Sequence, residues 1–470
     1  MARDGSGTRM QVVVLPLPAQ SHLNSLLHFS RVIAERGASV SFVATSTHIQ
    51  QVRRRAEGWE LHNFDISFRE LPMPHLTAGD LDSQSTTMFP LQLIPLFEAV
   101  ENQLGSHVDQ LLQTICSENK NRVVLIYDVA MGWVQTVATK YSIPAYVFRP
   151  TGSYYNLWMK RTRDETMVVS PVNVSLKRCF PERFIKNWRR QRTQLGPAKG
   201  YIMNTFSALE SEFIHQEREE LVFGGKPVWT VGPLLPQAFF NYVQRLRLQT
   251  DTECMRWLDT QAPTSVLYVS FGSVSSLSAT QIRELADGLE RSGQPFLWVL
   301  RISDEAHLST ESQYDSACEF LQQGYERRLE GRGFIARNWA PQIDILLHKS
   351  TGGFLTHCGW NSTVESISAG VGMLAWPLHS DQFANSALIT SELKAGVQVK
   401  EWQNAKENEM VSAEEVEKAV KRLMRSEEGM QVRKRVQELR NEARKAVGDG
   451  GSSWKDVDSL LHHFSQSFSE

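Results

Sequence analysis

Residues 352–366, GGFLTHCGWNSTVES, hold the local pattern that decides the fold. A short apolar run is followed by Gly359, which permits a tight turn, and then by residues with helical spacing. Asn361 and Ser362 would begin that helix, where free backbone N–H groups and the positive end of the helix dipole favour an anion. His357 would add one more hydrogen-bond donor. The stretch therefore predicts a strand–turn–helix unit that could hold a diphosphate.

The same residues allow an interpretation that needs no ligand. Ser362 and Glu365 have the spacing of a capping box, in which side chains satisfy the helix's own N–H groups. The flanking residues favour a ligand. Trp339 offers a ring face for a base, and Asp381 and Gln382 follow the next apolar run, where they could contact a sugar. We therefore predict a nucleotide-sugar site over residues 339–382.

Short apolar runs alternate with helical patterns along most of the chain, which is typical of parallel sheets covered on both faces. We predict an α/β fold with two Rossmann-like βαβ domains that face each other across a cleft. The N-terminal domain would span 1–233, a linker 234–251 and the C-terminal domain 252–450, and a final helix at 451–470 would pack back on the N-terminal domain. Strands are expected within residues 11–16, 39–45, 66–71, 122–128, 144–150, 200–206, 227–233, 265–273, 295–301, 332–339, 352–360, 371–377 and 396–400.

Composition excludes several classes of protein. The 50 Lys and Arg residues are balanced by 52 Asp and Glu, so a basic nucleic-acid-binding surface is not expected. The first apolar run, 12–15, is too short for a signal peptide, and no later run reaches the roughly 18 apolar residues of a membrane span. The five cysteines are scattered without a CxxC pair, which indicates reduced thiols in a cytoplasmic protein. We expect a monomer without stable membrane association.

Two titratable residues lie at the ends of predicted strands. His22 follows the first strand in PAQSHLN, and Asp128 ends the strand at 122–128, so both would lie at the carboxyl edge where open α/β sheets bind ligands. A neutral imidazole with a pKa near 6.5 suits a general base, and a carboxylate can fix its tautomer. Two alternatives need no catalysis: His22 could be satisfied by a backbone carbonyl, and Asp128 could cap a helix at 131–139.

The span from Trp339 to Gln382 resembles the signature box of plant secondary-product glycosyltransferases, the family 1 enzymes that use UDP-sugars and have the GT-B fold. Other segments agree in order: PAQSHLN, MNTFSALE, VGPL, CMRWLD, VLYVSFGS and FLWVLR. The resemblance covers essentially the whole chain. It implies an inverting transfer of a sugar from a UDP-sugar to an acceptor, with His22 as the base and Asp128 as its partner, and without a metal or any other cofactor. The closing Gln382 indicates UDP-glucose as the donor.

The resemblance also implies a role for each residue of the donor site. It implies that Trp339 and the Ala340 backbone bind uracil and that Gln342 and Glu365 bind the ribose. The diphosphate would be bound by Ser273, His357, Asn361 and Ser362, and the sugar would be contacted by Trp360, Asp381 and Gln382. Two positions depart from the family pattern. Ser21 replaces a glycine, which would strain the backbone if that position needs an unusual conformation. Gly372 replaces a proline, which would loosen the entry to the next strand.

The acceptor is predicted less directly. The ending HSDQ at 379–382 resembles the zeatin O-glucosyltransferase branch, so a zeatin-type cytokinin is the first hypothesis. Alternatives are O- or C-glucosylation of a flavonoid or phenol, a sensor that binds UDP-sugar without turnover, and a non-hydrolysing epimerase. Aromatic and apolar residues at 84–97, at 151–160 and at Trp188 are expected to form the pocket for a small lipophilic acceptor.

Overall fold

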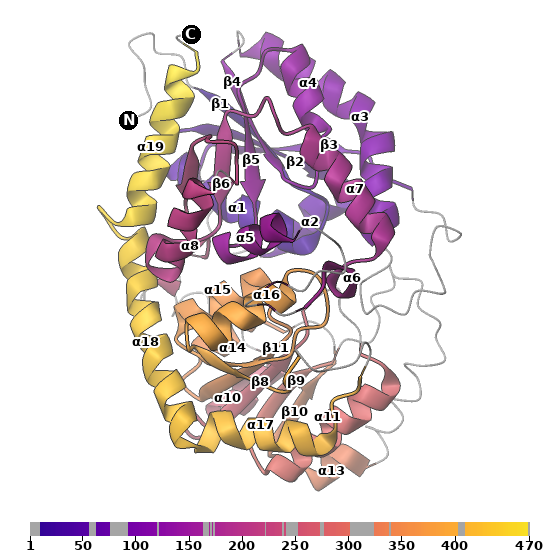
Figure 1. Cartoon of the computed structure of the whole chain (residues 1–470), viewed down its shortest axis with the longest axis vertical. Coiled ribbons are helices and arrows are strands. Elements are labelled where there is room, and N and C mark those ends of the chain that lie inside the picture. Colours follow the sequence, from indigo (N-terminus) through magenta and orange to yellow (C-terminus); the bar gives the residue numbers. More distant parts are fainter. Residues whose placement is uncertain are drawn as a thin grey trace.

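The computed structural model describes residues 10–55, 63–75, 93–119, 122–162, 169, 172, 174–220, 222–236, 239–240, 252–272, 277–300, 324–337, 340–402 and 409–468. Within them the chain forms two parallel sheets, of seven and six strands, stacked one above the other in Figure 1. Each strand lies where the apolar runs of the sequence predict one. The predicted α/β fold with two Rossmann-like domains is confirmed. Most of the predicted linker, 237–238 and 241–251, lies outside the described residues.

The first sheet has the strand order β3-β2-β1-β4-β5-β6-β7, and every pair is parallel. Because successive side chains of a strand point to opposite faces, Val12 and Val14 pack on one face and Val13 and Leu15 on the other. The strands are β1 (Gln11–Leu15), β2 (Ser39–Thr45), β3 (Ile66–Leu71), β4 (Val123–Asp128), β5 (Ala145–Arg149), β6 (Gly200–Met203) and β7 (Val228–Thr230).

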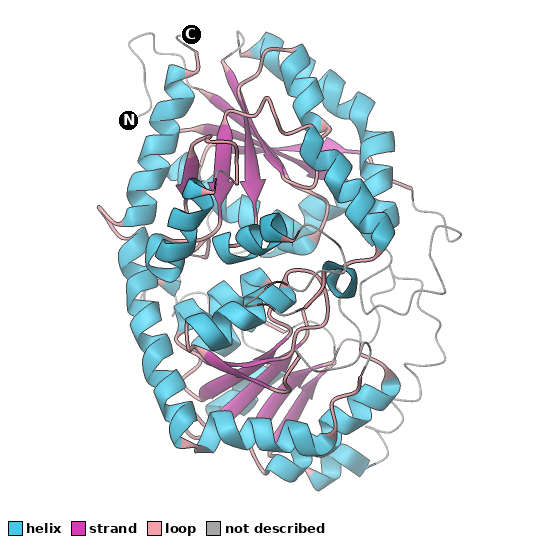
Figure 2. Cartoon of the chain, in the orientation of Figure 1, coloured by secondary structure: helices cyan, strands magenta, loops and turns pink. Residues whose placement is uncertain are grey.

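Helices cover both faces of this sheet, as Figure 2 shows. One face packs against α1 (Gln20–Glu35), α2 (Ser46–Arg55) and the C-terminal α19 (Ser452–Gln466), and the other against α3 (Leu93–Glu118) and α4 (Val134–Lys140). The remaining helices of this half are α5 (Ser153–Arg161), α6 (Leu176–Cys179), α7 (Glu182–Thr193) and α8 (Ser207–Glu219).

The second sheet has the order β10-β9-β8-β11-β12-β13 and is also parallel throughout. Its strands are β8 (Val266–Ser270), β9 (Phe296–Val299), β10 (Gly333–Ala336), β11 (Thr351–Thr356), β12 (Gly372–Ala375) and β13 (Gly396–Gln398). The helices are α10 (Glu253–Asp259), α11 (Ala279–Ser292), α13 (Glu326–Arg328), α14 (Gln342–Leu347), α15 (Trp360–Ala369), α16 (Gln382–Ala387), a π-helical turn (Leu388–Glu392), α17 (Ala413–Arg425) and α18 (Glu427–Val447).

The last two helices connect the two halves along one side of the molecule. In Figure 1, α18 and α19 run along the left edge, from the lower sheet to the upper one. Asp456 of α19 accepts hydrogen bonds from the backbone and hydroxyl of Thr230, both at 2.7 Å. Ser453 donates to the carbonyl oxygen of Gly232, in the segment that leaves β7, at 2.5 Å. The C-terminal helix therefore packs on the first sheet, beside the point where the chain leaves it.

Neither departure from the family pattern disturbs the fold. Ser21 lies in the first turn of α1 with helical rather than left-handed backbone, so the expected strain is absent. Gly372 begins β12 beneath α18, and a Cβ there would lie 2.8 Å from Cγ1 of Val432. Glycine at this position therefore lets α18 pack closely against the strand entry.

A side chain at position 372 should consequently destabilise the protein. Gly372→Ala is expected to lower the free energy of unfolding by about 1–3 kcal/mol, because Val432 or α18 must move. Gly105→Ala in α3 is the matched control, since no atom lies within 4 Å of the added Cβ. It should raise stability by about 0.5–1 kcal/mol. Urea denaturation of both variants measures the difference, and equal stability of the two would contradict the packing.

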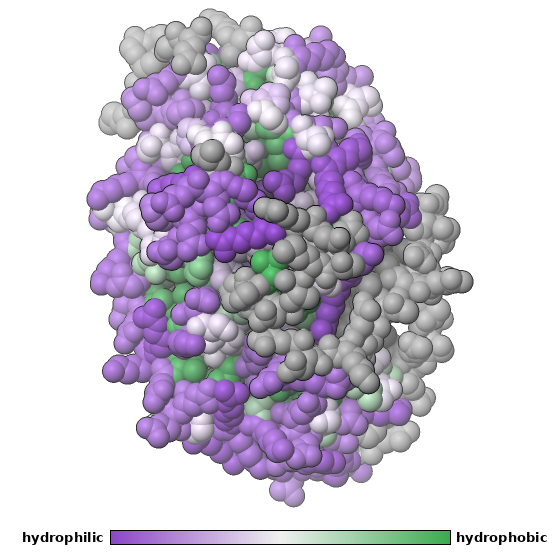
Figure 3. Space-filling view, viewed as in Figure 1, coloured by the Kyte–Doolittle hydropathy of each residue, from purple (hydrophilic) through white to green (hydrophobic). Residues whose placement is uncertain are grey.

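Few large hydrophobic side chains are exposed among the residues that the structure describes. Hydrophilic residues cover most of the described surface on the face shown in Figure 3. The large hydrophobic side chains exposed in the described ranges are Met73, Met410 and Met430, which are separate in sequence. Among the helices of the described ranges, none has the length and apolar character needed to cross a bilayer.

Candidate active site at the junction of the two domains

His22 and Asp128 meet at the carboxyl edge of the first sheet. His22 lies in the first turn of α1, directly after β1, and Asp128 is the last residue of the adjacent β4. Nδ1 of His22 lies 2.6 Å from Oδ2 of Asp128, whose side chain is fully buried. Oδ1 of Asp128 accepts the backbone N–H of Ala130 at 2.9 Å. The carboxylate is thus fixed, and it holds the imidazole with the proton on Nδ1 and the lone pair on Nε2.

These contacts overturn both non-catalytic alternatives for the pair. His22 is held by a carboxylate and not by a backbone carbonyl. The helix after β4 begins at Val134 with Trp133 at its N-cap, so Asp128 does not cap it. The helix expected at 131–139 starts later because residues 129–133 form turns.

The charges around His22 favour its protonated form. Burial alone would lower the pKa of His22, but the charge of Asp128, the hydrogen bond to Asp128 and the charge of Asp381 together raise it above 6.5. Asp381 belongs to the second domain, where it follows β12 and bonds to Asn385 at 2.8 Å. The charge of this carboxylate, in the other domain, thus favours the protonated form of His22.

The first turn of α15 carries the backbone donors of the candidate donor site. Gly359 is its N-cap and makes no side-chain cap, and no acceptor within the described residues bonds the N–H groups of Trp360, Asn361 and Ser362. The capping-box alternative is therefore wrong, because Ser362 lies inside the helix and Glu365 bonds elsewhere. A helix end with free N–H groups can hold a diphosphate.

His357 lies in the turn between β11 and α15, pressed between two glycines. A Cβ at Gly272 or at Gly359 would come within 2.6 Å or 2.5 Å of its Nε2, so both loops approach the ring closely. Burial lowers the pKa of His357 to about 4, which keeps the ring neutral at pH 7. Nδ1 is buried without a hydrogen-bond partner among the described residues.

The two residues expected at the ribose are already bonded to each other. Nε2 of Gln342 donates to Glu365 at 2.6 Å and to Ser362 at 3.1 Å, and Oε1 of Gln342 accepts the hydroxyl of Tyr268 at 3.2 Å. Burial raises the pKa of Glu365 to about 7, partly offset by the bond from Gln342. A buried acid beside an amide is suited to binding vicinal hydroxyl groups.

The side chains of two expected sugar contacts point elsewhere. The indole N–H of Trp360 donates to the carbonyl oxygen of Asn204 in the first domain at 2.7 Å. Oε1 of Gln382 accepts the backbone N–H groups of Leu378 and His379 at 2.9 and 3.0 Å, so the amide faces its own loop. Of the three residues expected at the sugar, Asp381 is the one whose side chain is not turned to a backbone group by these bonds; it accepts a hydrogen bond from Asn385 at 2.8 Å.

Ser273 and Trp339 lie outside the described residues, so their predicted contacts with diphosphate and uracil remain predictions. Ala340 is described and buried at the start of the segment that leads into α14.

The segment 151–160 forms the start of α5, which carries the expected aromatic residues. Tyr154 packs edge-on against Phe213, with 4.8 Å between ring centroids. Burial, and next the charge of Asp381, raise the pKa of Tyr155, so its hydroxyl stays protonated. Trp188 packs against the core and beneath the guanidinium of Arg192. Residues 84–92 lie outside the described residues.

Sequence reasoning missed the acids that hold α5 in place. Glu210 of α8 accepts the backbone N–H groups of Ser153 and Tyr154 at 3.1 and 2.9 Å and thereby caps α5. Glu217 accepts the hydroxyl of Ser153 at 2.7 Å, and burial raises its pKa to about 7. Glu210 is the acid that ends the segment MNTFSALE, and its position there could have indicated a role in the fold.

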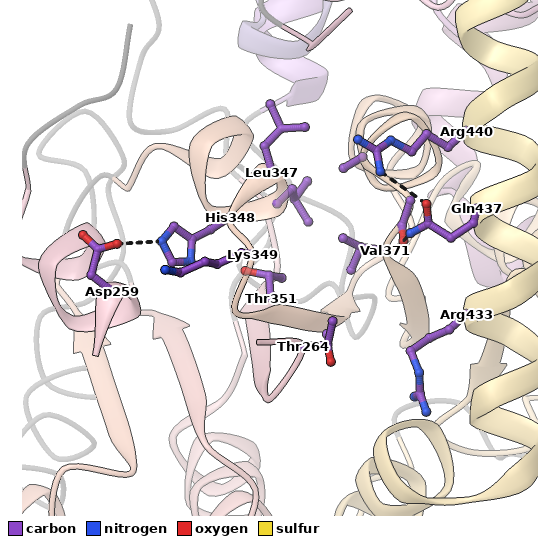
Figure 4. Close-up of a pocket in the computed structure, with 14 residues that line it drawn as sticks. Asp259, Thr264, Leu347, His348, Lys349, Thr351, Val371, Arg433, Gln437 and Arg440 are labelled. Carbon is purple, nitrogen blue, oxygen red and sulfur yellow. Dashed lines mark hydrogen bonds and ion pairs between the residues drawn. The ribbon is translucent and has the colours of Figure 1, made fainter. Parts of the chain in front are cut away.

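A separate cavity of ≈ 500 Å³ lies at the opposite, amino-terminal edge of the second sheet (Figure 4). Its polar side chains bond within the protein: His348 to Asp259 at 3.2 Å, and Gln437 of α18 to the carbonyl oxygen of Gly370 at 2.9 Å. Arg440 bonds in turn to Gln437 at 3.2 Å. The bond from Gln437 joins α18 to the turn before β12, away from the candidate active site. Within the described ranges, no cluster of His, Cys, Asp or Glu is placed to hold a metal ion.

Two parallel α/β domains with a histidine–aspartate pair on one and a helix N-terminus on the other define a glycosyltransferase of the GT-B class. Comparison with known families agrees. A model described as "Glycosyltransferase, N-terminal domain" matches residues 8–236, and one described as "UDP-glucoronosyl and UDP-glucosyl transferase" matches residues 232–436. The chain belongs to the UDP-glycosyltransferase family.

Relatives match along nearly their whole length. Cis-zeatin O-glucosyltransferase 1 of Zea mays is 37% identical, with 97% of this chain and 98% of the relative covered. Zeatin O-xylosyltransferase of Phaseolus vulgaris is 38% identical, with 98% and 99% covered. Among solved structures, UGT2 of Phytolacca americana complexed with UDP-2fluoro-glucose and pterostilbene has a TM-score of 0.76 and 28% identity, with 97% of this chain and 100% of that chain covered. The protein is therefore a UDP-glycosyltransferase related to zeatin O-glycosyltransferases.

Proposed function

We propose that the protein transfers glucose from UDP-glucose to a hydroxyl group of a zeatin-type cytokinin, with inversion at the anomeric carbon. The observation that carries the proposed chemistry is the His22–Asp128 pair at 2.6 Å, at the carboxyl edge of the first sheet. The similarity to zeatin O-glucosyltransferases along the whole chain supports the choice of acceptor.

In the proposed reaction, Nε2 of His22 takes the proton of the acceptor hydroxyl as its oxygen attacks the anomeric carbon. The new carbon–oxygen bond forms while the bond to the diphosphate breaks, and its electron pair leaves with UDP. Asp128 stabilises the imidazolium, as the aspartate of a serine protease triad does. The N–H groups at the start of α15 and the ring of His357 stabilise the departing diphosphate, so the scheme routes no step through a metal.

Two alternatives share this site. Zeatin O-xylosyltransferase of Phaseolus vulgaris is as similar as the glucosyltransferases, so xylose is the competing sugar. A flavonoid or phenol is the competing acceptor, because solved relatives include complexes with pterostilbene and quercetin. C-glucosylation would use the same base on a carbon nucleophile.

A substrate panel separates these possibilities. We expect UDP release from UDP-glucose with cis- or trans-zeatin, unchanged by EDTA, and a glucosylated product by mass spectrometry. UDP-xylose should support slower turnover. Faster turnover of flavonols or simple phenols would refute the cytokinin assignment and keep the chemistry, while loss of activity in EDTA would refute the metal-free scheme.

A further inference from the structure

We propose that Asn361 is a positioning residue that fixes the helix carrying His22 against the helix that holds the diphosphate, with Ser25 as its partner. The inference rests on the proposed role of His22 as the base. Asn361 is the second residue of α15, and Ser25 lies in the first domain, one turn after His22 in α1.

Both ends of the Asn361 carboxamide bond to α1. Nδ2 donates to the carbonyl oxygen of Ser21 at 2.9 Å, and Oδ1 accepts the hydroxyl of Ser25 at 3.0 Å. Ser21 directly precedes His22, so the two bonds hold the turn of α1 that carries the imidazole. We call this pair of bonds the Asn361 bridge. In Figure 1, α15 lies below α1 where the two domains meet.

Ser25 is a buried polar residue of α1, with 2% of its surface exposed. Helical spacing places it on the face that carries Ser21 and His22, and not on the apolar face formed by Leu23, Leu26 and Leu27. A buried hydroxyl is costly unless it is hydrogen-bonded. The carbonyl oxygen of Ser21 lies within reach at 3.2 Å, but the shorter bond goes to Asn361 of the other domain. The position thus gives α1 a specific contact with α15.

The bridge connects two parts of one reaction. The backbone N–H groups of the first turn of α15 are the candidate diphosphate donors, while the side chain of the same turn holds α1. One residue therefore sets the distance between the leaving group and the base. Catalytic geometry is sensitive to such distances, since a displacement of about 1 Å can cost about 100-fold in rate. Loss of the bridge should lower kcat and leave the backbone contacts with UDP intact.

Ser25→Ala tests the bridge without altering a donor-site residue. We expect kcat to fall about tenfold, with KM for UDP-glucose and the affinity for UDP changed less than twofold, and Ser25→Thr to recover part of the loss. Ser30→Ala is the matched control: it lies on the same helix, is fully buried, and its hydroxyl bonds only to the carbonyl oxygen of Leu26 at 2.8 Å. Its kcat should stay within twofold of wild type.

Two further measurements sharpen the test. In an Asn361→Ala background, Ser25→Ala should change kcat less than twofold, because its partner is already gone. Amide hydrogen exchange can be measured without an acceptor substrate. Ser25→Ala should speed amide exchange at residues 20–26 several-fold, whereas Ser30→Ala should not. Equal kcat values for Ser25→Ala and Ser30→Ala, or a loss of UDP affinity in place of kcat, would overturn the inference. If the wild-type enzyme does not turn over with zeatin, the proposed acceptor is wrong. The amide hydrogen exchange at residues 20–26 would then test the Asn361 bridge independently of that acceptor.

Discussion

Replacing His22 with alanine is expected to lower kcat by about 10²–10⁴-fold, the range that a positioned general base supplies. The imidazole is the group whose free Nε2 can take the acceptor proton, because Nδ1 is bonded to Asp128 at 2.6 Å. Isothermal titration should show UDP affinity within twofold of wild type, since the predicted donor contacts come from α15 and not from α1. The loss should therefore appear in turnover at saturating donor.

The same variant distinguishes catalysis from packing. His22 is partly exposed, with 22% of its side-chain surface accessible, so its removal should change the unfolding midpoint little. His28 on the same helix is buried at 7% exposure, and burial lowers its pKa to about 3, as fits a structural residue. His28→Ala should cost stability with a smaller effect on kcat of the folded fraction. A His22→Ala enzyme that retains more than a tenth of wild-type kcat would contradict the role of His22 as the base.

Asp128→Asn should also lower kcat by about 10²–10⁴-fold, and it should move the pH profile. An amide facing Nδ1 can stabilise the wrong tautomer of the imidazole, as in a serine protease triad. Asp128 raises the pKa of His22, so its neutralisation should lower that pKa. Activity needs neutral His22, which is present above its pKa. The acidic limb of kcat/KM should therefore shift to lower pH while the plateau falls.

Profiles from pH 5 to 9 measure both effects. Asp109→Asn removes an equal charge at the exposed pair with Lys140, where the atoms lie 2.8 Å apart, and should leave plateau and limb unchanged. An acidic limb in Asp128→Asn that stays in place, or moves to higher pH, would show that Asp128 does not control the protonation of His22.

Local patterns in the sequence predicted the strands and the strand–turn–helix unit of the donor site, because apolar runs and turn glycines act over a few residues. The pairing of His22 with Asp128, 106 positions apart, was also predictable, since both residues follow strands that end at the same edge of the sheet. Because the strands are parallel, their carboxyl ends share one edge, and two local patterns therefore predict a contact between residues distant in sequence.

The orientation of individual side chains was not predictable in this way. Asn361 and Trp360 were expected at the diphosphate and the sugar, yet their side chains bond to Ser21, Ser25 and Asn204 of the other domain. These contacts depend on how the two domains dock, and no periodicity in either segment encodes that. Ser25 shares the face of α1 that carries His22, but nothing in the local sequence indicates its partner in the other domain.

The contact between Ser453 and Gly232 has a consequence for motion. The chain passes between the two domains after β7 and again through α18 and α19, and the hydrogen bond joins these two passages on one side of the molecule. The segment that leaves β7 and the start of α19 are therefore in contact at Gly232 and Ser453. Opening and closing of the domains for substrate exchange is expected to pivot near this contact, so the largest excursions occur at the far rim. Residues beside Gly232 should move least during the catalytic cycle.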